Sequence, residues 1–124
     1  MTPDELRNAI QELLARHPNV SVSLAGHAAH AQRYITTEGK PIGFERDRIK
    51  FKNLWVRTAD VLLHKLDDIE RTDFDPANFS VSKPNHNLFG EPAFKDCNLT
   101  RFRVTALSQA ERIIWEVAGK VGAP

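Results

Sequence analysis

The sequence predicts a single α+β domain over residues 1–124, in which a mostly antiparallel sheet of four or five strands packs in two layers against an N-terminal and a C-terminal helix. The chain has the length of one typical domain. Apolar residues recur at helical spacing at both ends of the chain, and between the ends they alternate as in half-buried strands. Strands that follow one another between helices are typical of the α+β class.

The first helix is marked by its start and by its end. Thr2 can cap the helix, Pro3 suits the first turn, and Glu5 completes a Thr-x-x-Glu capping box. Pro18 forces the helix to stop. The apolar stripe between these signals consists of Leu6, Ala9, Ile10 and Leu13.

Alternating apolar residues predict the strands. Residues 20–24 alternate valine or leucine with serine, and residues 33–46 predict a hairpin whose turn contains glycine and proline. Residues 48–57 predict a further strand, and the alternation changes phase near Asn53, which predicts a bulge. Residues 99–107 predict the last strand, in which phenylalanine and valine alternate with arginines.

A long irregular segment is predicted before that last strand. Residues 58–69 predict one to three helical turns, and residues from about 71 to 98 show no periodicity. Irregular segments of this length are unusual in compact domains and are often functional. Within it, residues 83–87 offer a polar tip that Leu88 and Phe94 can anchor to the core. The tip is a candidate binding loop, and the alternative is that its asparagines bond their own backbone in turns.

The last helix is predicted to begin at a second capping box, formed by Ser108 and Glu111. Trp115 points roughly 130° away from the centre of the apolar face, at about 100° per residue. We therefore expect Trp115 to be a candidate residue of a protein interface. The apolar face itself collects Ala110, Ile113, Ile114, Val117 and Val121.

Composition narrows the class of protein. A single cysteine, Cys97, excludes an internal disulfide and a zinc site built from several cysteines, which fits a reducing compartment. The N-terminus lacks the basic flank of a signal peptide, and no stretch is apolar enough to span a membrane, so we expect a cytoplasmic protein.

The net charge of +1 conceals a segregation of charges. Residues 33–57 hold seven Arg or Lys against three acids, whereas residues 58–78 hold two against six. Such blocks can form a polar binding face, and they can equally form two neighbouring elements that neutralise each other.

Cations alternate along two of the predicted strands. Neutralised phosphates release counterions and aromatic rings stack on bases, so this composition suits nucleic acid. The alternative is the solvated outer face of a half-buried sheet, which has to be polar in any case. The candidate nucleic-acid-binding residues are Arg46, Arg48, Lys50, Lys52, Trp55, Arg57, Lys83, Asn85, His86, Asn87, Arg101 and Arg103.

No motif indicates a cofactor or a metal, and neither is expected. His27 and His30 would share one side of a helical turn, but the spacing places no third ligand beside them. The sequence contains no glycine-rich phosphate loop and no nucleophile elbow. The oligomeric state is left open.

Three hypotheses follow for the function. The first is a small cytoplasmic binding module of bacterial or phage type that contacts nucleic acid through the basic sheet face and the 83–87 loop. The second is a protein-interaction module, such as an inhibitor, adaptor or subunit, with Trp115 in its interface. The third is a small hydrolytic enzyme in which His86 and Asp73 or Asp75 act as acid and base, although no spacing requires it.

Overall fold

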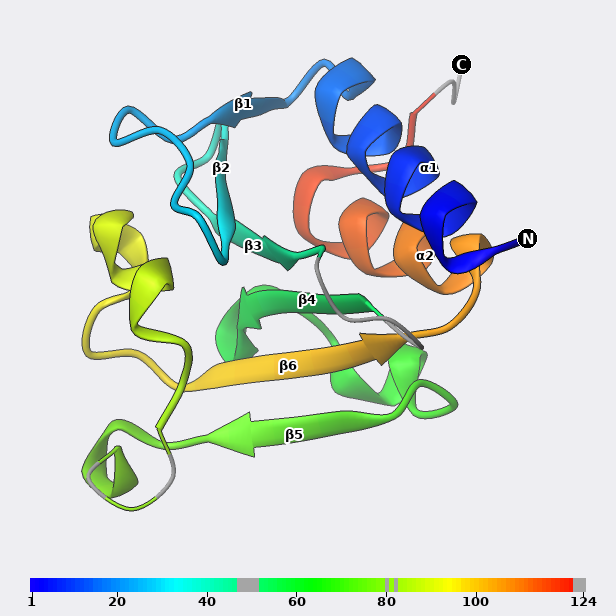
Figure 1. The fold of residues 1–124 in the computed structure, drawn as a ribbon. Coiled ribbons are helices and arrows are strands. Elements are labelled where there is room, and N and C mark those ends of the chain that lie inside the picture. The colour runs from blue at the N-terminus through cyan, green and yellow to red at the C-terminus, as the bar shows by residue number, and fades with distance from the viewer. Residues whose placement is uncertain (47–51, 80, 82, 122–124) are drawn as a thin grey trace.

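The protein folds as an antiparallel sheet with two helices on one of its faces (Figure 1). The computed structural model describes residues 1–46, 52–79, 81 and 83–121. The helices are α1 (Pro3–Arg16) and α2 (Leu107–Ala118). The strands are β1 (Val20–Val22), β2 (Gln32–Thr36), β3 (Pro41–Glu45), β4 (Lys52–Arg57), β5 (Arg71–Phe74) and β6 (Leu99–Val104). They pair in the order β1-β2-β3-β4-β6-β5, and each of these pairs is antiparallel.

The predicted α+β class is confirmed, whereas the predicted number of strands is wrong, because the sheet has six. The missed strand is β5, which lies at one edge of the sheet beside β6. Of its four residues Phe74 alone is buried, so the strand carries too little apolar alternation to be detected in the sequence. The irregular segment therefore begins after Phe74 and not at residue 71.

Helix α1 begins and ends as its sequence predicts. The Glu5 amide donates to the Thr2 hydroxyl at 3.1 Å, and the Thr2 amide donates to the Glu5 carboxylate at 3.0 Å, which completes the capping box. His17 caps the end of the helix immediately before Pro18. The buried face of the helix consists of Leu6, Ile10 and Leu14.

Helix α2 begins at a different cap from the predicted one. Its N-cap is Ala106, so Ser108 lies inside the first turn. The Gln109 side chain instead accepts the Thr105 amide at 2.9 Å. The predicted apolar face is buried, except that Val121 lies beyond the helix and is 44% exposed. Its buried members are Ala110, Ile113, Ile114 and Val117.

The principal core lies between the two helices and one face of the sheet. Strand residues of one parity point toward the helices because successive side chains of a strand alternate between its faces. The fully buried members from β3, β4 and β6 are Ile42, Phe44, Leu54, Val56, Phe102 and Val104.

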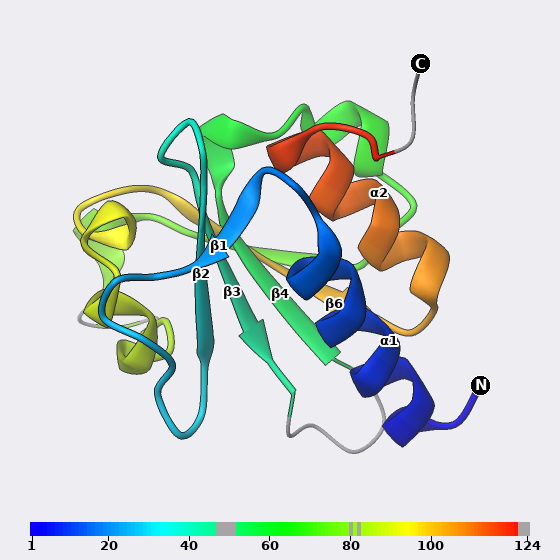
Figure 2. The same cartoon turned by 90° about the horizontal axis from the view of Figure 1, so that it is seen from above.

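The opposite face of the sheet, which we call the second face, is also covered. Segment 75–98 folds over it and contains three short 3-10 helices, η3 (Pro76–Asn78), η4 (His86–Gly90) and η5 (Pro92–Phe94). Figure 2 shows this segment on the side of the sheet away from α1 and α2. The predicted two-layer arrangement is therefore incomplete, because irregular chain forms a third layer. The second core comprises Ala31, Trp55, Phe74, Leu88, Phe94 and Leu99.

Strand β4 runs without the predicted bulge. Asn53 pairs with Glu45 on β3 and with Arg103 on β6, and the register continues unbroken along the strand. Lys52 therefore shares the helix-facing side with Leu54, whereas the residues of the other parity point to the second face.

Two short 3-10 helices, η1 (Thr58–Asp60) and η2 (Leu63–Leu66), stand between β4 and β5, where the sequence predicts one to three helical turns. Each spans a single turn and packs beside the end of the sheet. Within the described ranges, no helix has both the length and the apolar character that crossing a bilayer requires.

Candidate functional site

One end of the second face is polar, in contrast to the second core beside it. Strand pairing places Glu45 beside Asn53, and Asn53 beside Arg103. Asn85 reaches the same place from the covering segment, because its side chain contacts Glu45. We call this group the polar end of the second face, and its members are Glu45, Asn53, Asn85, Arg101 and Arg103.

Glu45 ties the covering segment to the sheet. Its carboxylate is buried and accepts hydrogen bonds from the Trp55 indole, from Asn53 Nδ2 at 3.2 Å and from Asn85 Nδ2 at 3.1 Å. These N–H donors replace the water that a buried carboxylate loses. Asn53 Oδ1, by contrast, is buried with no hydrogen-bond partner in the part of the chain that the structure describes. The polar end thus contains an acceptor that is still unsatisfied.

The 83–87 loop has an ordered base and an exposed tip. Asn85 Oδ1 accepts the backbone amide of Asn87 at 3.0 Å and its side-chain amide at 3.1 Å, which starts η4. The side chains of Lys83 and His86 are exposed on either side of Asn85. Asn85 therefore bonds the backbone of its own turn, as the second interpretation predicts, and it also bonds across to the sheet, while the binding role of the tip stays a prediction.

Arg33 of β2 holds the covering segment at a second point. Its guanidinium donates to the backbone carbonyls of Gly26 at 2.7 Å, Ala25 at 3.1 Å and Asn87 at 3.2 Å. Gly90 packs directly on this group, and a Cβ there would overlap the guanidinium. Sequence reasoning missed this role, because a strand arginine carries no signal of the loops that it will bond.

Arg101 and Arg103 are the cations of the polar end. The Arg101 guanidinium lies 5.6 Å from the centre of the Trp55 ring and 5.4 Å from that of Phe74, and it donates to Thr72 Oγ1 at 3.3 Å. Arg103 lies 3.6 Å from the Glu70 carboxylate, and its side chain is 42% exposed. Both side chains are half-buried, so their donors are oriented by the fold and still reach solvent.

Further residues that are predicted to bind nucleic acid are engaged within the protein. Trp55 is 1% exposed, so its ring cannot stack on a base. Lys52 is 3% exposed, and its ammonium donates to the Arg46 carbonyl at 2.7 Å. Arg57 bonds Asp60 through two hydrogen bonds, at 2.8 and 3.1 Å. The predicted residues that lie outside the described part of the chain are Arg48 and Lys50.

The residues considered for hydrolysis are not hydrogen-bonded to one another in the described part of the chain. Asp73 accepts from the Thr100 hydroxyl at 2.9 Å, and Asp75 caps η3 by accepting the Ala77 amide at 2.9 Å. Among the described residues, no hydrogen bond joins His86 to either carboxylate. Both aspartates thus have structural partners within the chain.

The histidine pair considered for metal binding lies in the turn between β1 and β2. His27 Nδ1 accepts the Arg33 amide at 3.0 Å, and its ring packs at a tilt against Tyr34, with 5.0 Å between the ring centres. Burial lowers the pKa of His27 below its usual range, and the positive charges of Arg33 and Arg46 add to this effect. Over the residues that the structure describes, no group of three or more His, Cys, Asp or Glu side chains is arranged to hold a metal ion.

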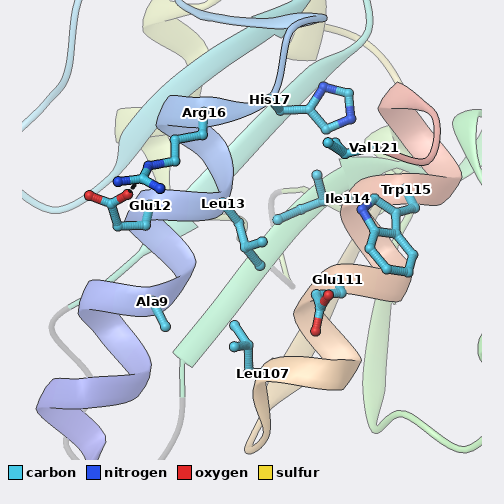
Figure 3. Close-up of a pocket in the computed structure, with 10 residues that line it drawn as sticks. All are labelled: Ala9, Glu12, Leu13, Arg16, His17, Leu107, Glu111, Ile114, Trp115 and Val121. Carbon is cyan, nitrogen blue, oxygen red and sulfur yellow. Dashed lines mark ion pairs between the residues drawn. The ribbon is translucent and has the colours of Figure 1, made fainter. Parts of the chain in front are cut away.

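A second surface lies on the other side of the molecule, where α1 and α2 form a groove of about 720 Å³ (Figure 3). Leu13 of α1 and Leu107 of α2 face each other across it, and Ile114 forms its floor. Trp115 forms part of the α2 wall, so the residue singled out in the sequence does border a surface hollow. The other lining residues are Ala9, Glu12, Arg16, His17, Glu111 and Val121.

Comparison with known proteins assigns a function to neither surface. The geometry of the two surfaces is therefore the basis for inferring function. No protein-family model matches the chain, and neither a curated protein nor a solved structure matches it.

Proposed function

We propose that the protein binds nucleic acid at the polar end of the second face, with cations on phosphates and the 83–87 loop on base edges. The observation that carries the proposal is the hydrogen bond from Asn85 to Glu45, 3.1 Å long. It joins the loop to β3, two strands across the sheet from β6, which bears both Arg101 and Arg103. This proximity supports treating the loop and the β6 arginines, which the sequence indicated separately, as one proposed surface.

The cations of this surface suit phosphate groups. Arg101 and Arg103 are half-buried, and Lys83 is exposed two residues before Asn85 in the loop. A guanidinium matches two phosphate oxygens at once, which makes arginine a strong phosphate ligand. Binding through these contacts should weaken steeply with salt, because counterions are released from the nucleic acid.

The loop supplies groups that can distinguish bases. The side chains of Asn87 and His86 offer donors and acceptors at the surface, and asparagine can pair with two atoms of one base edge. The expected stacking on Trp55 is not part of the proposal, since that ring is buried. Trp55 instead supports Arg101 from below and donates to Glu45, and so it positions the surface.

Fluorescence anisotropy tests the proposal. Labelled single-stranded and double-stranded DNA and RNA are titrated with the protein at about 50 and about 200 mM salt. We expect micromolar or tighter binding of at least one probe, with a loss of roughly tenfold or more between the two salt concentrations. Absence of binding to all four probes at the lower salt would overturn the proposal.

Charge variants locate the surface. Arg103→Gln should weaken binding several-fold and reduce the salt slope by about one for each lost phosphate contact. Arg16→Gln is the matched control, since Arg16 lies on α1 beyond the opposite face of the sheet and its side chain is 83% exposed. If Arg16→Gln weakens binding as much as Arg103→Gln, the polar end is not the binding surface.

A further inference from the structure

Trp115 stands between two hollows on the helical side of the molecule. It lines the groove between α1 and α2, and it also lines a smaller hollow of about 370 Å³ on the outer side of α2. The two hollows differ in chemistry, and a molecule that lies across Trp115 would contact both.

The groove between the helices is apolar. Its walls and floor come from Leu13, Leu107 and Ile114, and of these Ile114 is buried while the two leucines are half-buried. His17 closes one end, and two hydrogen bonds hold its ring in place. Its Nδ1 accepts the Asn19 amide at 3.0 Å, and its Nε2–H therefore donates to the Gly119 carbonyl at 2.6 Å. The groove thus has an apolar floor and a fixed end.

Most of the charged side chains at the rim of the groove are paired with one another. Glu12 and Arg16 are bonded to each other at 2.5 Å on α1. Glu111 adds a negative charge on the α2 wall, close to the centre of the groove (Figure 3). An acidic group of a partner would be repelled from this wall.

The smaller hollow has more cations than acids in its lining. Lys65 and Lys120 are exposed at its rim, and the Lys120 ammonium lies 5.6 Å from the centre of the Trp115 ring. Arg112 also lines it, but its charge is matched by two hydrogen bonds to Asp68, at 2.7 and 2.8 Å. Glu116 lines this hollow as well, and its carboxylate accepts the Leu62 amide at 3.1 Å. The two lysines outnumber this one acid, so this side of Trp115 keeps a net positive charge, opposite to the charge of Glu111.

We infer that the helical side binds an amphipathic helix of a partner protein, with apolar side chains in the groove and acidic side chains over Lys65 and Lys120. Helices that bind in this way present apolar residues at i, i+3 or i+4, and i+7. The acids fall on one flank only, because Glu111 repels them from the other. Trp115 is the central contact, as buried tryptophans are in many interfaces.

Among the described residues, a second copy of the chain offers no such helix. The apolar residues of α1 and α2 are already buried in the chain's own core, and Leu6, Ile10 and Ile113 are among them. Neither helix can insert its buried face into the groove of another copy without leaving its own core. The partner is therefore a different protein, and this surface is independent of the proposed nucleic-acid site.

Designed peptides test the inference. The first is a labelled helical peptide of about 15 residues with leucines at the anchor spacing and glutamates along one flank. The second carries lysine in place of each glutamate, and the third carries serine in place of each leucine. We expect micromolar binding of the first peptide by anisotropy, and binding at least about tenfold weaker for the other two.

Variants of the protein assign the contacts. Trp115→Ala should weaken binding of the first peptide at least about tenfold. The charge reversal Lys65→Glu with Lys120→Glu should weaken binding of the glutamate peptide and strengthen binding of the lysine peptide. Both substitutions change exposed side chains. Leu24→Ala is the control, since Leu24 is a fully exposed apolar residue in the turn after β1.

Three results would overturn the inference: no binding of the glutamate peptide, equal binding of the glutamate and lysine peptides, or self-association of the chain that Trp115→Ala abolishes. Circular dichroism of Trp115→Ala separates lost contacts from lost folding, and the charge reversal gives a second readout. Nucleic-acid binding should be unchanged in these variants, so this inference and the proposed function fail separately.

Discussion

Gly43 lies directly beneath Leu88. A Cβ at Gly43 would overlap Leu88 Cδ2 and would stand 3.2 Å from Trp55 Cβ. The absence of a side chain at this position of β3 lets Leu88 pack against the sheet, where it is fully buried. The covering segment, and with it the 83–87 loop, depends on this close approach.

Gly43→Ala is therefore expected to destabilise the protein by about 1–3 kcal/mol, the usual cost of inserting a methyl group into a packed core. Urea unfolding followed by tryptophan fluorescence measures the effect. Leu88→Ala removes the overlapping atoms at its own cost of about 2–5 kcal/mol. Gly43→Ala should cost less in that background. If the two costs add to within about 0.5 kcal/mol, the proposed overlap is wrong.

Glu45→Gln is expected to cost about 1–3 kcal/mol, because one oxygen that accepts hydrogen bonds becomes an NH₂ group facing other donors. Asn85 loses its anchor, so amide exchange at Asn87 should become faster. Glu38→Gln is the matched control, since the Glu38 side chain is 79% exposed and its nearest cation lies 3.7 Å away. Equal losses of stability in the two variants would contradict the role given to Glu45.

Arg33→Lys is expected to destabilise the protein by about 1–3 kcal/mol, because an ammonium cannot bond three carbonyls placed around a planar guanidinium. Thermal unfolding measures the change. Arg7→Lys makes the same exchange on α1, where Arg7 pairs with Asp4 at 3.5 Å, and should cost under about 0.5 kcal/mol. A cost as small at position 33 would show that the three bonds contribute little.

His27 is expected to make the folded state less stable in mild acid. Burial is the main cause that lowers its pKa, so the unfolded chain binds the proton more tightly than the folded one. Stability is then highest above the ordinary histidine pKa of about 6.5 and falls as the pH drops from there to the folded pKa. Protonation also removes the acceptor for the Arg33 amide.

His27→Asn keeps a hydrogen-bond acceptor and removes the titration. Urea unfolding of the wild type and the variant at pH values from about 5 to about 8 compares the two. The stability of the wild type should fall more steeply between about pH 6.5 and the acid limit. Parallel curves would mean that His27 titrates alike in the folded and the unfolded chain.

The helices were predictable because their signals are local. The capping box of Thr2 with Glu5 and the stop at Pro18 act over a few residues, and the structure confirms both. The start of α2 was predicted wrongly, because extended chain through Thr105 places the cap at Ala106. Strand β5 was missed for a different reason, since an edge strand with one buried residue has almost no periodic pattern.

The candidate site was predictable only in part. The alternation in β6 predicts that Arg101 and Arg103 share one face, and both point to the second face. The alternation also gave Trp55 that direction correctly, but it could not show that segment 75–98 would bury the ring. Lys52 was predicted to lie on the basic face, but it lies on the helix-facing side, because β4 runs without the predicted bulge.

The sequence by itself determined the α+β class, the two flanking helices and the set of side chains that each strand directs to one face. These features follow from capping hydrogen bonds between residues close in the chain and from the alternation of side chains between the two faces of a strand. The tertiary structure alone decided which of those side chains meet solvent. Leu88 reaches the sheet over Gly43, Asn85 bonds Glu45, and Trp115 borders two hollows through contacts between residues distant in sequence, which no local pattern encodes.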